Sequence, residues 1–148
     1  MNSVVLAHLT EQAEKARTEA AQLLAEERQN KQKIALQLQT LQQYRSDYAE
    51  QLQLHMQQGI ASHLLNNYRQ FLLSLDSAVS RAQDALVDQQ TKVDNSQQQW
   101  MTKQRKLASY ETLHGRQQTA AQRVINKREQ KLADELSLAM HMRQRASR

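Results

Sequence analysis

Apolar residues recur at a strict spacing of seven in the second half of the chain. The members of this column are Leu72, Val79, Leu86, Val93, Trp100 and Leu107. A sustained seven-residue apolar repeat keeps one face of a helix turned toward a partner helix, so the pattern predicts a coiled coil. The intervening d-type positions turn polar midway: Leu75, Ala82, Gln89, Ser96, Lys103 and Tyr110. We therefore expect a long amphipathic helix whose seam is only modestly stable.

The first half of the chain repeats in alternating steps of three and four residues. The predicted seam positions are Leu6, Leu9, Ala13, Ala16, Ala20, Leu23, Ile34, Gln37, Leu41, Tyr44 and Tyr48. Glu27 and Asn30 interrupt this series, which predicts a weakly packed layer in the middle of the seam. Leu24, Leu38 and Leu52 widen the stripe to one flank. This half therefore also predicts an amphipathic helix.

One non-periodic stretch, residues 57–62, separates the two patterns. Gly59 can take the left-handed conformation that ends a helix, and Ile60 can supply the apolar contact of a Schellman cap. Ser62 is the expected cap of the following helix, through its hydroxyl. So short a connection returns the chain beside itself, which predicts an all-α fold: two long helices forming an antiparallel coiled-coil hairpin. The alternative is one unbroken helix that dimerises, because a lone glycine costs a helix only about 1 kcal/mol.

The hairpin is expected to form a single domain over residues 1–148. Helix 1 is predicted at about 3–57, the turn at about 58–62 and helix 2 at about 63–140. Reversal near residue 60 sets residue i roughly opposite residue 121 minus i. The second helix therefore overhangs the first, with residues 116–148 unpaired.

Composition supports helices and excludes most other fold classes. The chain has 148 residues, no proline, no cysteine and two glycines, so it lacks the turn residues that a sheet protein needs. A mean hydropathy of -0.83 makes disorder the main rival, and the apolar periodicity argues against it. No window approaches the roughly 20 apolar residues that span a bilayer, and no signal peptide is recognisable. We expect a soluble chain in a reducing compartment such as the cytoplasm.

Charge is distributed unevenly along the chain. Residues 1–58 carry six basic and seven acidic side chains, residues 59–115 six and five, and residues 116–148 eight and three, so the sums are −1, +1 and +5. The basic residues of the overhang are Arg116, Arg123, Lys127, Arg128, Lys131, Arg143, Arg145 and Arg148. Such a segment attracts acidic surfaces, although simple solvation of a helix end also explains it. Nucleic-acid binding is disfavoured, because no aromatic residue is interleaved to stack bases.

No catalytic constellation is present in the sequence. It has no G-x-x-x-x-G-K-[ST] phosphate loop, no G-x-S-x-G elbow and no H-E-x-x-H zinc pair. The histidines are scattered: His8, His55, His63, His114 and His141. A two-helix hairpin also offers no concave pocket that excludes water. We expect a protein that is not an enzyme and that binds no cofactor or metal.

Aromatic residues gather on both sides of the predicted turn. The register sets Tyr44 and Tyr48 opposite residues 73–77, near Phe71. Rings bring a large contact area at low entropy cost, and tyrosine is enriched at protein interfaces for this reason. Phe71 and Ala78 fall one place before the seam column, so we expect them on a more exposed flank. Spacing alone favours binding and internal packing equally.

Residues 41–78 also contain three short elements in a fixed order: L-x-x-Y-x-x-x-Y, a GIAS turn and N-Y-x-Q-F-x-x-x-L. This run resembles the flagellar FliJ family of the bacterial type III export apparatus. Segments around Trp100, residues 110–113 and residues 116–121 are similar to the family as well, so the likeness covers about residues 35–125. It implies an antiparallel coiled coil similar to the central stalk subunit of rotary ATP synthases.

The resemblance also implies partners. In that family the open end of the hairpin inserts into the hexameric ring of the export ATPase, and the protein contacts the membrane export gate and handles escort chaperones. Carried over by position, the gate-binding surface is Gln37, Leu41, Tyr44, Tyr48, Phe71, Leu75 and Ala78. Ala82 stands where the family has a further contact, a histidine. The expected ATPase-ring contacts are Arg116, Arg123, Arg128 and Lys131.

The resemblance places such a protein in the cytoplasm, peripherally associated with the inner membrane at the flagellar basal body. It implies no direct insertion into the membrane and no nucleic-acid partner. Three alternatives remain open from the sequence: the equivalent stalk of a virulence-type secretion system, a nucleic-acid-binding coiled coil and a purely structural homodimer.

Overall fold

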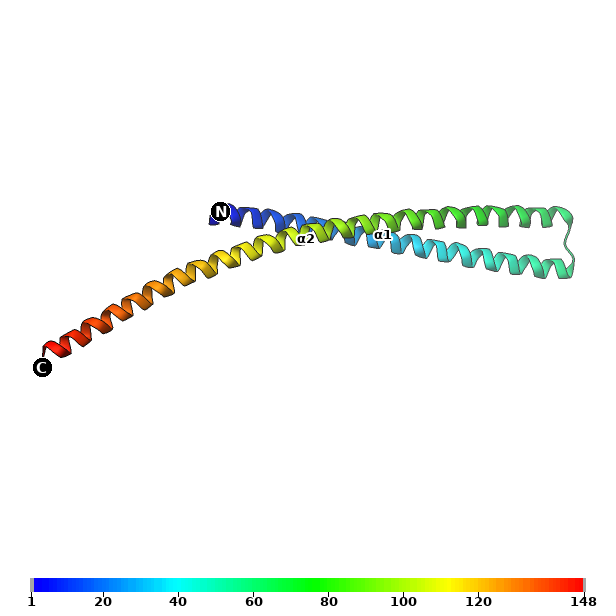
Figure 1. Ribbon diagram of the computed structural model, residues 1–148. Coiled ribbons are helices and arrows are strands. Elements are labelled where there is room, and N and C mark those ends of the chain that lie inside the picture. Colours follow the sequence, from blue (N-terminus) through cyan, green and yellow to red (C-terminus); the bar gives the residue numbers. More distant parts are fainter. Residues whose placement is uncertain (1, 148) are drawn as a thin grey trace. The chain divides into compact units, whose positions relative to one another are not determined.

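The computed structural model describes residues 2–147, which form two helices (Figure 1). Helix α1 spans Ser3–Gln58 and helix α2 spans Ser62–Ala146. They run antiparallel and pack against each other, and the described residues contain no strand. The predicted helical hairpin is confirmed. Helix α2 continues to Ala146 rather than ending near residue 140.

The reversal of the chain occurs at Gly59. This residue has a φ of +88°, a left-handed conformation in which a side chain is strained. Its N–H donates to the carbonyl of Met56 at 3.4 Å, the inner bond of a Schellman-type helix end. The prediction that Ser62 caps α2 is wrong. The N–H of Leu65 donates to the carbonyl of Ala61 at 3.0 Å, so Ala61 occupies the cap position and Ser62 is already helical.

The contacts divide the described chain into two units. Unit 1 consists of residues 2–17 and 103–147, and unit 2 consists of Thr18–Thr102. In unit 1 the first part of α1 lies against α2 and buries Leu6, Ala13 and Leu107. Helix α2 then continues past the amino-terminal end of α1 (Figure 1), and residues 118–147 are all exposed. The single domain expected from the sequence stays a prediction.

In unit 2 the seam buries both apolar and polar side chains. Leu24, Leu75 and Val93 are 5–7% exposed, and Gln89 and Ser96 are both 6% exposed. The Nε2 of Gln89 donates to the backbone carbonyl of Glu27 at 3.0 Å and to its carboxylate. We call Glu27, Gln89 and Ser96 the polar layer. No buried side-chain polar atom lacks a partner among the described residues. At the interruption predicted from the sequence, Gln89 and Glu27 are hydrogen-bonded to each other.

The part of the α1 seam that lies in unit 2 differs from the prediction. Leu23 was expected in the seam, but it is 40% exposed, while Leu24, expected on the flank, is 7% exposed. The exposed column is Leu23, Asn30, Gln37 and Tyr44, and the column that faces α2 instead is Leu24, Lys31, Leu38, Arg45 and Leu52. The second column faces α2 because it carries three leucines. The long aliphatic stems of its Lys and Arg can also cover apolar surface while their charges stay in water.

The antiparallel register agrees with the predicted one to within a few residues in each unit. In unit 1, Arg17 Nη1 lies 3.5 Å from Gln104 Oε1. In unit 2, Arg45 Nε lies 2.8 Å from Asp76 Oδ1. In both pairs, residue i faces residue 121 minus i.

Candidate protein-binding surfaces

Four aromatic side chains meet across the two helices in unit 2. Tyr44 and Tyr48 come from α1, and Tyr68 and Phe71 come from α2; we call these four the aromatic cluster. The ring centroid of Tyr48 lies 4.9 Å from that of Tyr68 and 4.5 Å from that of Phe71. Tyr44 approaches Phe71 edge-on at 6.4 Å. These separations are typical of favourable ring pairs, so the cluster helps to hold α1 against α2.

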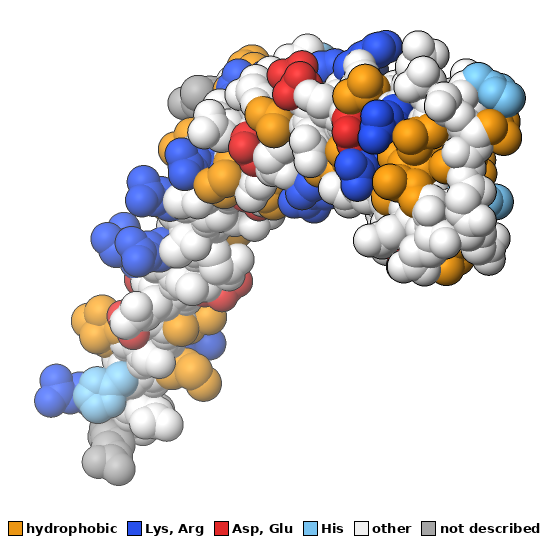
Figure 2. All heavy atoms as spheres, turned by 90° about the vertical axis from the view of Figure 1, so that its right-hand side faces the viewer, with side chains coloured by type: hydrophobic (Ala, Val, Ile, Leu, Met, Phe, Trp, Pro, Cys, Tyr) orange, Lys and Arg blue, Asp and Glu red, His pale blue; other side chains and the backbone are white. Residues whose placement is uncertain are grey.

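The aromatic cluster is also open to solvent. Tyr44 is 55% exposed and Phe71 is 38% exposed, while Tyr48 and Tyr68 are half-buried. The adjoining turn segment, residues 51–68, contains no Asp, Glu, Lys or Arg. Figure 2 faces this end of unit 2 and shows hydrophobic side chains gathered there, with histidine beside them. The exposed rings therefore adjoin an uncharged segment that includes the turn.

The structure brings together three of the seven residues predicted to bind the export gate, since Tyr44, Tyr48 and Phe71 are in ring contact. Gln37 belongs to the exposed column of α1, in line with Tyr44. The remaining predicted gate residues are Leu41 and Ala78, which are half-buried, and Leu75, which is buried; Ala82 is half-buried as well. The exposed flank position expected for Phe71 is confirmed.

Sequence reasoning missed Tyr68. The signal was available, because Tyr68 lies seven residues before Leu75 and so extends the d-type column toward the turn. Its ring also lies 5.5 Å from the imidazole of His55. The aromatic cluster is therefore larger than the spacing of Tyr44, Tyr48 and Phe71 had indicated.

An ion pair beside the aromatic cluster was also missed. Arg45 and Asp76 join the two helices, with side chains 43% and 49% exposed. The hydrogen bond to Asp76, and then its negative charge, raise the pKa of Arg45 above its ordinary value. A raised pKa of a basic group means that its contribution to stability is present at lower pH and is lost only as pH rises through the folded-state value. Arg45 therefore stays charged throughout the physiological range.

The second candidate surface is the part of α2 beyond the paired helices, residues 116–147, which we call the basic extension. Four residues of this extension are predicted to contact the ATPase ring, and all four are exposed: Arg116, Arg123, Arg128 and Lys131. The one ion pair of the described chain is that of Arg45 and Asp76, so these cations have no acidic partner there. Figure 2 shows basic side chains along this segment, interspersed with hydrophobic ones. Arg148 lies outside the described residues.

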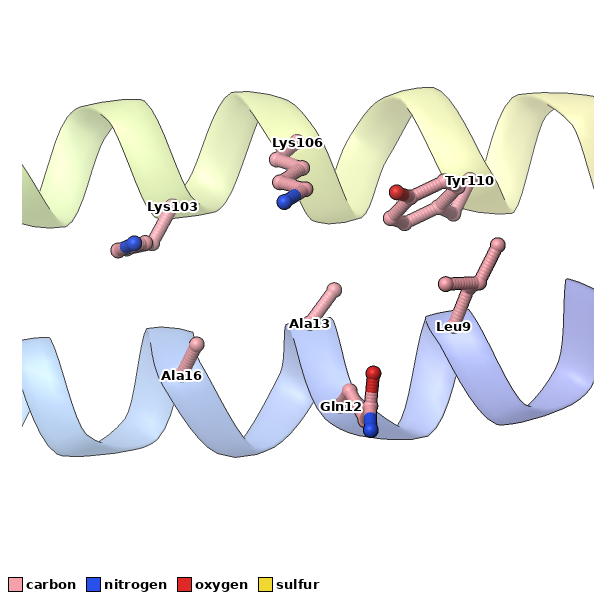
Figure 3. Close-up of a pocket in the computed structure, with 7 residues that line it drawn as sticks. All are labelled: Leu9, Gln12, Ala13, Ala16, Lys103, Lys106 and Tyr110. Atoms are coloured by element: carbon pink, nitrogen blue, oxygen red, sulfur yellow. The ribbon is translucent and has the colours of Figure 1, made fainter.

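A third feature is a hollow of about 190 Å³ between α1 and α2 in unit 1 (Figure 3). We call it the lysine hollow. Its lining is Leu9, Gln12, Ala13 and Ala16 from α1, and Lys103, Lys106 and Tyr110 from α2. The short side chains of Ala13 and Ala16 leave this space open. Its polar groups come from Lys103, Lys106 and Tyr110 on α2 and from Gln12 on α1. Nothing in the sequence analysis had singled this site out.

The described residues contain no group of three or more His, Cys, Asp or Glu side chains that could hold a metal ion. Neither described helix has a stretch that is long and apolar enough to cross a bilayer.

Fold and surfaces together define the chain as an antiparallel coiled-coil hairpin with exposed aromatic and basic surfaces. The family model "Flagellar FliJ protein" matches residues 2–146, and the chain belongs to the FliJ family. It is 36% identical over 138 residues to the flagellar FliJ protein of Escherichia coli K12, covering 93% of this chain and 94% of that one. The identity to the flagellar FliJ protein of Salmonella typhi is 36% over 135 residues, covering 91% and 92%.

The fold is also found in a solved structure. A protein from Chlamydia trachomatis, described as a YscO homolog, superimposes with a TM-score of 0.68 over 98% of this chain and 94% of its own length. The sequence identity is 14%, so this likeness concerns the fold alone.

Proposed function

We propose that the protein is a non-catalytic stalk component of the bacterial flagellar type III export apparatus. The observation that carries this proposal is its membership of the FliJ family along residues 2–146. In this role the chain binds its partners and links them, and it catalyses no reaction of its own. It works in the cytoplasm and associates peripherally with the inner membrane at the flagellar basal body.

The aromatic cluster is the proposed centre of the export-gate contact. Interfaces draw most of their energy from a few ring-bearing side chains surrounded by weaker contacts. Tyr44 and Phe71 supply such rings with 55% and 38% of their surface exposed, and Gln37 extends the exposed column of α1. Leu75 has a supporting role, because at 7% exposure it belongs to the buried seam between α1 and α2.

The basic extension is the proposed contact with the ring of the export ATPase. Residues 116–148 carry eight basic and three acidic side chains, an excess that draws the helix toward an acidic channel. Arg116, Arg123, Arg128 and Lys131 are exposed and have no acidic partner within the described chain. Handling of escort chaperones belongs to the same proposal, through contacts that are not assigned to particular residues.

The equivalent role in a virulence-type secretion system is the second candidate. It is favoured by the fold shared with the YscO homolog, at a TM-score of 0.68. The two flagellar relatives at 36% identity favour the flagellar assignment. Restoration of swimming in a flagellated host that lacks its own FliJ would distinguish the two roles.

Two substitutions on α2 separate binding from folding. Phe71→Ala removes an exposed ring, so we expect a small loss of stability and a large loss of export. Leu75→Ala removes a buried side chain and is expected to cost about 2 to 5 kcal/mol. Urea denaturation of the purified variants measures their stability. Soft-agar motility of the complemented strain measures export.

Leu73→Ala is the matched control. Leu73 lies between the other two positions in the same helix, but it is 68% exposed and is not a predicted gate residue. We expect this variant to keep both wild-type stability and wild-type motility. Motility that survives Phe71→Ala while protein levels are normal would refute the gate surface.

A further inference from the structure

The lysine hollow has an apolar floor and a basic rim. Leu9, Ala13 and Ala16 point from α1 toward α2, while Lys106 and the ring of Tyr110 lie on the α2 side of the space (Figure 3). Ala13 is buried at 6% exposure, and Leu9 and Ala16 are half-buried. The side chains of Leu9 and Ala16 thus remain partly uncovered in a place where a coiled coil usually closes its seam.

The cause of the hollow is the residue at position 103. In the d-type column of α2, Lys103 follows Ser96 and precedes Tyr110. A lysine keeps its ammonium group in water, and Lys103 is exposed, so it does not fill the seam above Ala13 and Ala16. Lys106 is exposed as well. Within the described chain neither ammonium group has an ion-pair partner.

The dimensions and charge of the site indicate its occupant. A cavity of about 150 Å³ lined by aliphatic groups can hold a benzene ring. At about 190 Å³, the lysine hollow therefore accommodates one bulky apolar side chain. The two unpaired lysines at its rim favour a ligand that carries negative charge close to that side chain. The groove between two packed helices also accepts the side-chain ridge of a third helix.

We propose that this groove is a docking site for an acidic amphipathic helix of a protein partner. One phenylalanine or leucine of that helix enters the hollow, and Asp or Glu residues on the adjacent turns pair with Lys103 and Lys106. The site shares no residue with the aromatic cluster or with the four residues predicted to contact the ATPase ring. It can therefore be tested independently of the proposed export role.

A fluorescent synthetic peptide tests this site on the full chain. The probe is a capped, helix-forming peptide in which one Phe has Glu residues three and four positions away on both sides. Binding is followed by fluorescence anisotropy at physiological ionic strength. We expect K103Q/K106Q to weaken binding about fivefold or more, because both exposed ion pairs are removed. Ala16→Leu, which fills the hollow, should weaken it comparably while circular dichroism stays unchanged.

Three controls make the outcome decisive. K127Q/R145Q removes the same charge from the basic extension and should change the affinity by less than about twofold. A peptide with Gln in place of Glu, and one with Ala in place of Phe, should both bind more weakly than the probe. Equal losses in K103Q/K106Q and K127Q/R145Q, or full competition by inorganic tripolyphosphate, would leave only unspecific anion binding and overturn the proposal. So would an affinity that Ala16→Leu leaves unchanged.

Discussion

Gln89 occupies a seam position that a leucine could fill, yet it is only 6% exposed. Its amide donates to the backbone carbonyl and to the carboxylate of Glu27, so the polar group is buried with its partners. A buried polar contact of this kind favours one alignment of two helices over its neighbours, because any slip leaves the polar groups unpaired. The polar layer thus trades some stability for a defined register.

Substitutions at Gln89 follow from this geometry. Gln89→Ala removes the donor and leaves the acceptors of Glu27 without it, so we expect a loss of about 1 to 3 kcal/mol in the free energy of unfolding. Gln89→Leu restores apolar volume and should be closer to wild type. Urea denaturation compares the variants. An Ala variant as stable as wild type would mean that the hydrogen bonds contribute nothing.

The sequence was least informative about which individual side chains of α1 are buried in the seam. The repeat of α2 correctly predicted burial of Leu75, Val93 and Leu107. In α1, two neighbouring columns compete, and counting steps of three and four chose Leu23 over Leu24. The choice depends on how the stems of Lys31 and Arg45 cover apolar surface, which residue types alone do not reveal.

Two long helices and one tight connection make up the described chain. Both helices were predictable, because helix-favouring residues and a seven-residue repeat agree over most of their length. The turn was predictable from Gly59 alone, but the cap of α2 was not. A serine hydroxyl usually caps a helix, and here the short connection gives that position to Ala61.

The two glycines offer a matched test of the turn. Gly59 has a φ of +88° with no atom within 4 Å of an added Cβ, so Gly59→Ala meets backbone strain without steric conflict. We expect a loss of about 1 to 2 kcal/mol. Gly115 lies inside α2 with equally open space, and Gly115→Ala should add up to about 1 kcal/mol. Thermal melting of both variants measures the contrast, and equal melting temperatures would contradict the assigned turn.

Local opening should differ along unit 2. The polar layer forgoes part of the apolar burial that stabilises the rest of the seam. Backbone amides near Glu27 and Gln89 should therefore exchange with solvent faster than those near Leu41 and Leu75. Native-state hydrogen exchange followed by mass spectrometry tests this expectation. Uniform protection along unit 2 would show that the hydrogen bonds fully compensate for the missing apolar contacts.

The aromatic cluster and the basic extension differ in physical character. The aromatic cluster adjoins a segment without fixed charge, whereas residues 116–148 carry the excess of +5. The charge asymmetry was predictable from the sequence, and the proposed partners come from the family resemblance. The lysine hollow was not readable, because it depends on which side chains of α1 lie opposite Lys103 and Lys106.

Salt dependence distinguishes the proposed role from nucleic-acid binding. For a chain that neutralises phosphates, the logarithm of the DNA affinity falls steeply and linearly with the logarithm of the salt concentration. We expect weak DNA binding at physiological ionic strength, since the basic extension has no aromatic residue to stack bases. Filter binding at several salt concentrations measures it. Tight binding that persists at physiological salt would favour a nucleic-acid partner over the export ATPase.

Binding of two variants to two purified partners, the export ATPase and the cytoplasmic part of the export gate, tests whether the proposed surfaces act separately. Phe71→Ala should weaken gate binding about tenfold or more and leave ATPase binding unchanged. Replacing Arg123, Arg128 and Lys131 together by Gln should weaken ATPase binding, more at low salt than at high, and leave gate binding unchanged. Variants that lose both partners equally, or neither, would contradict the assignment of separate surfaces.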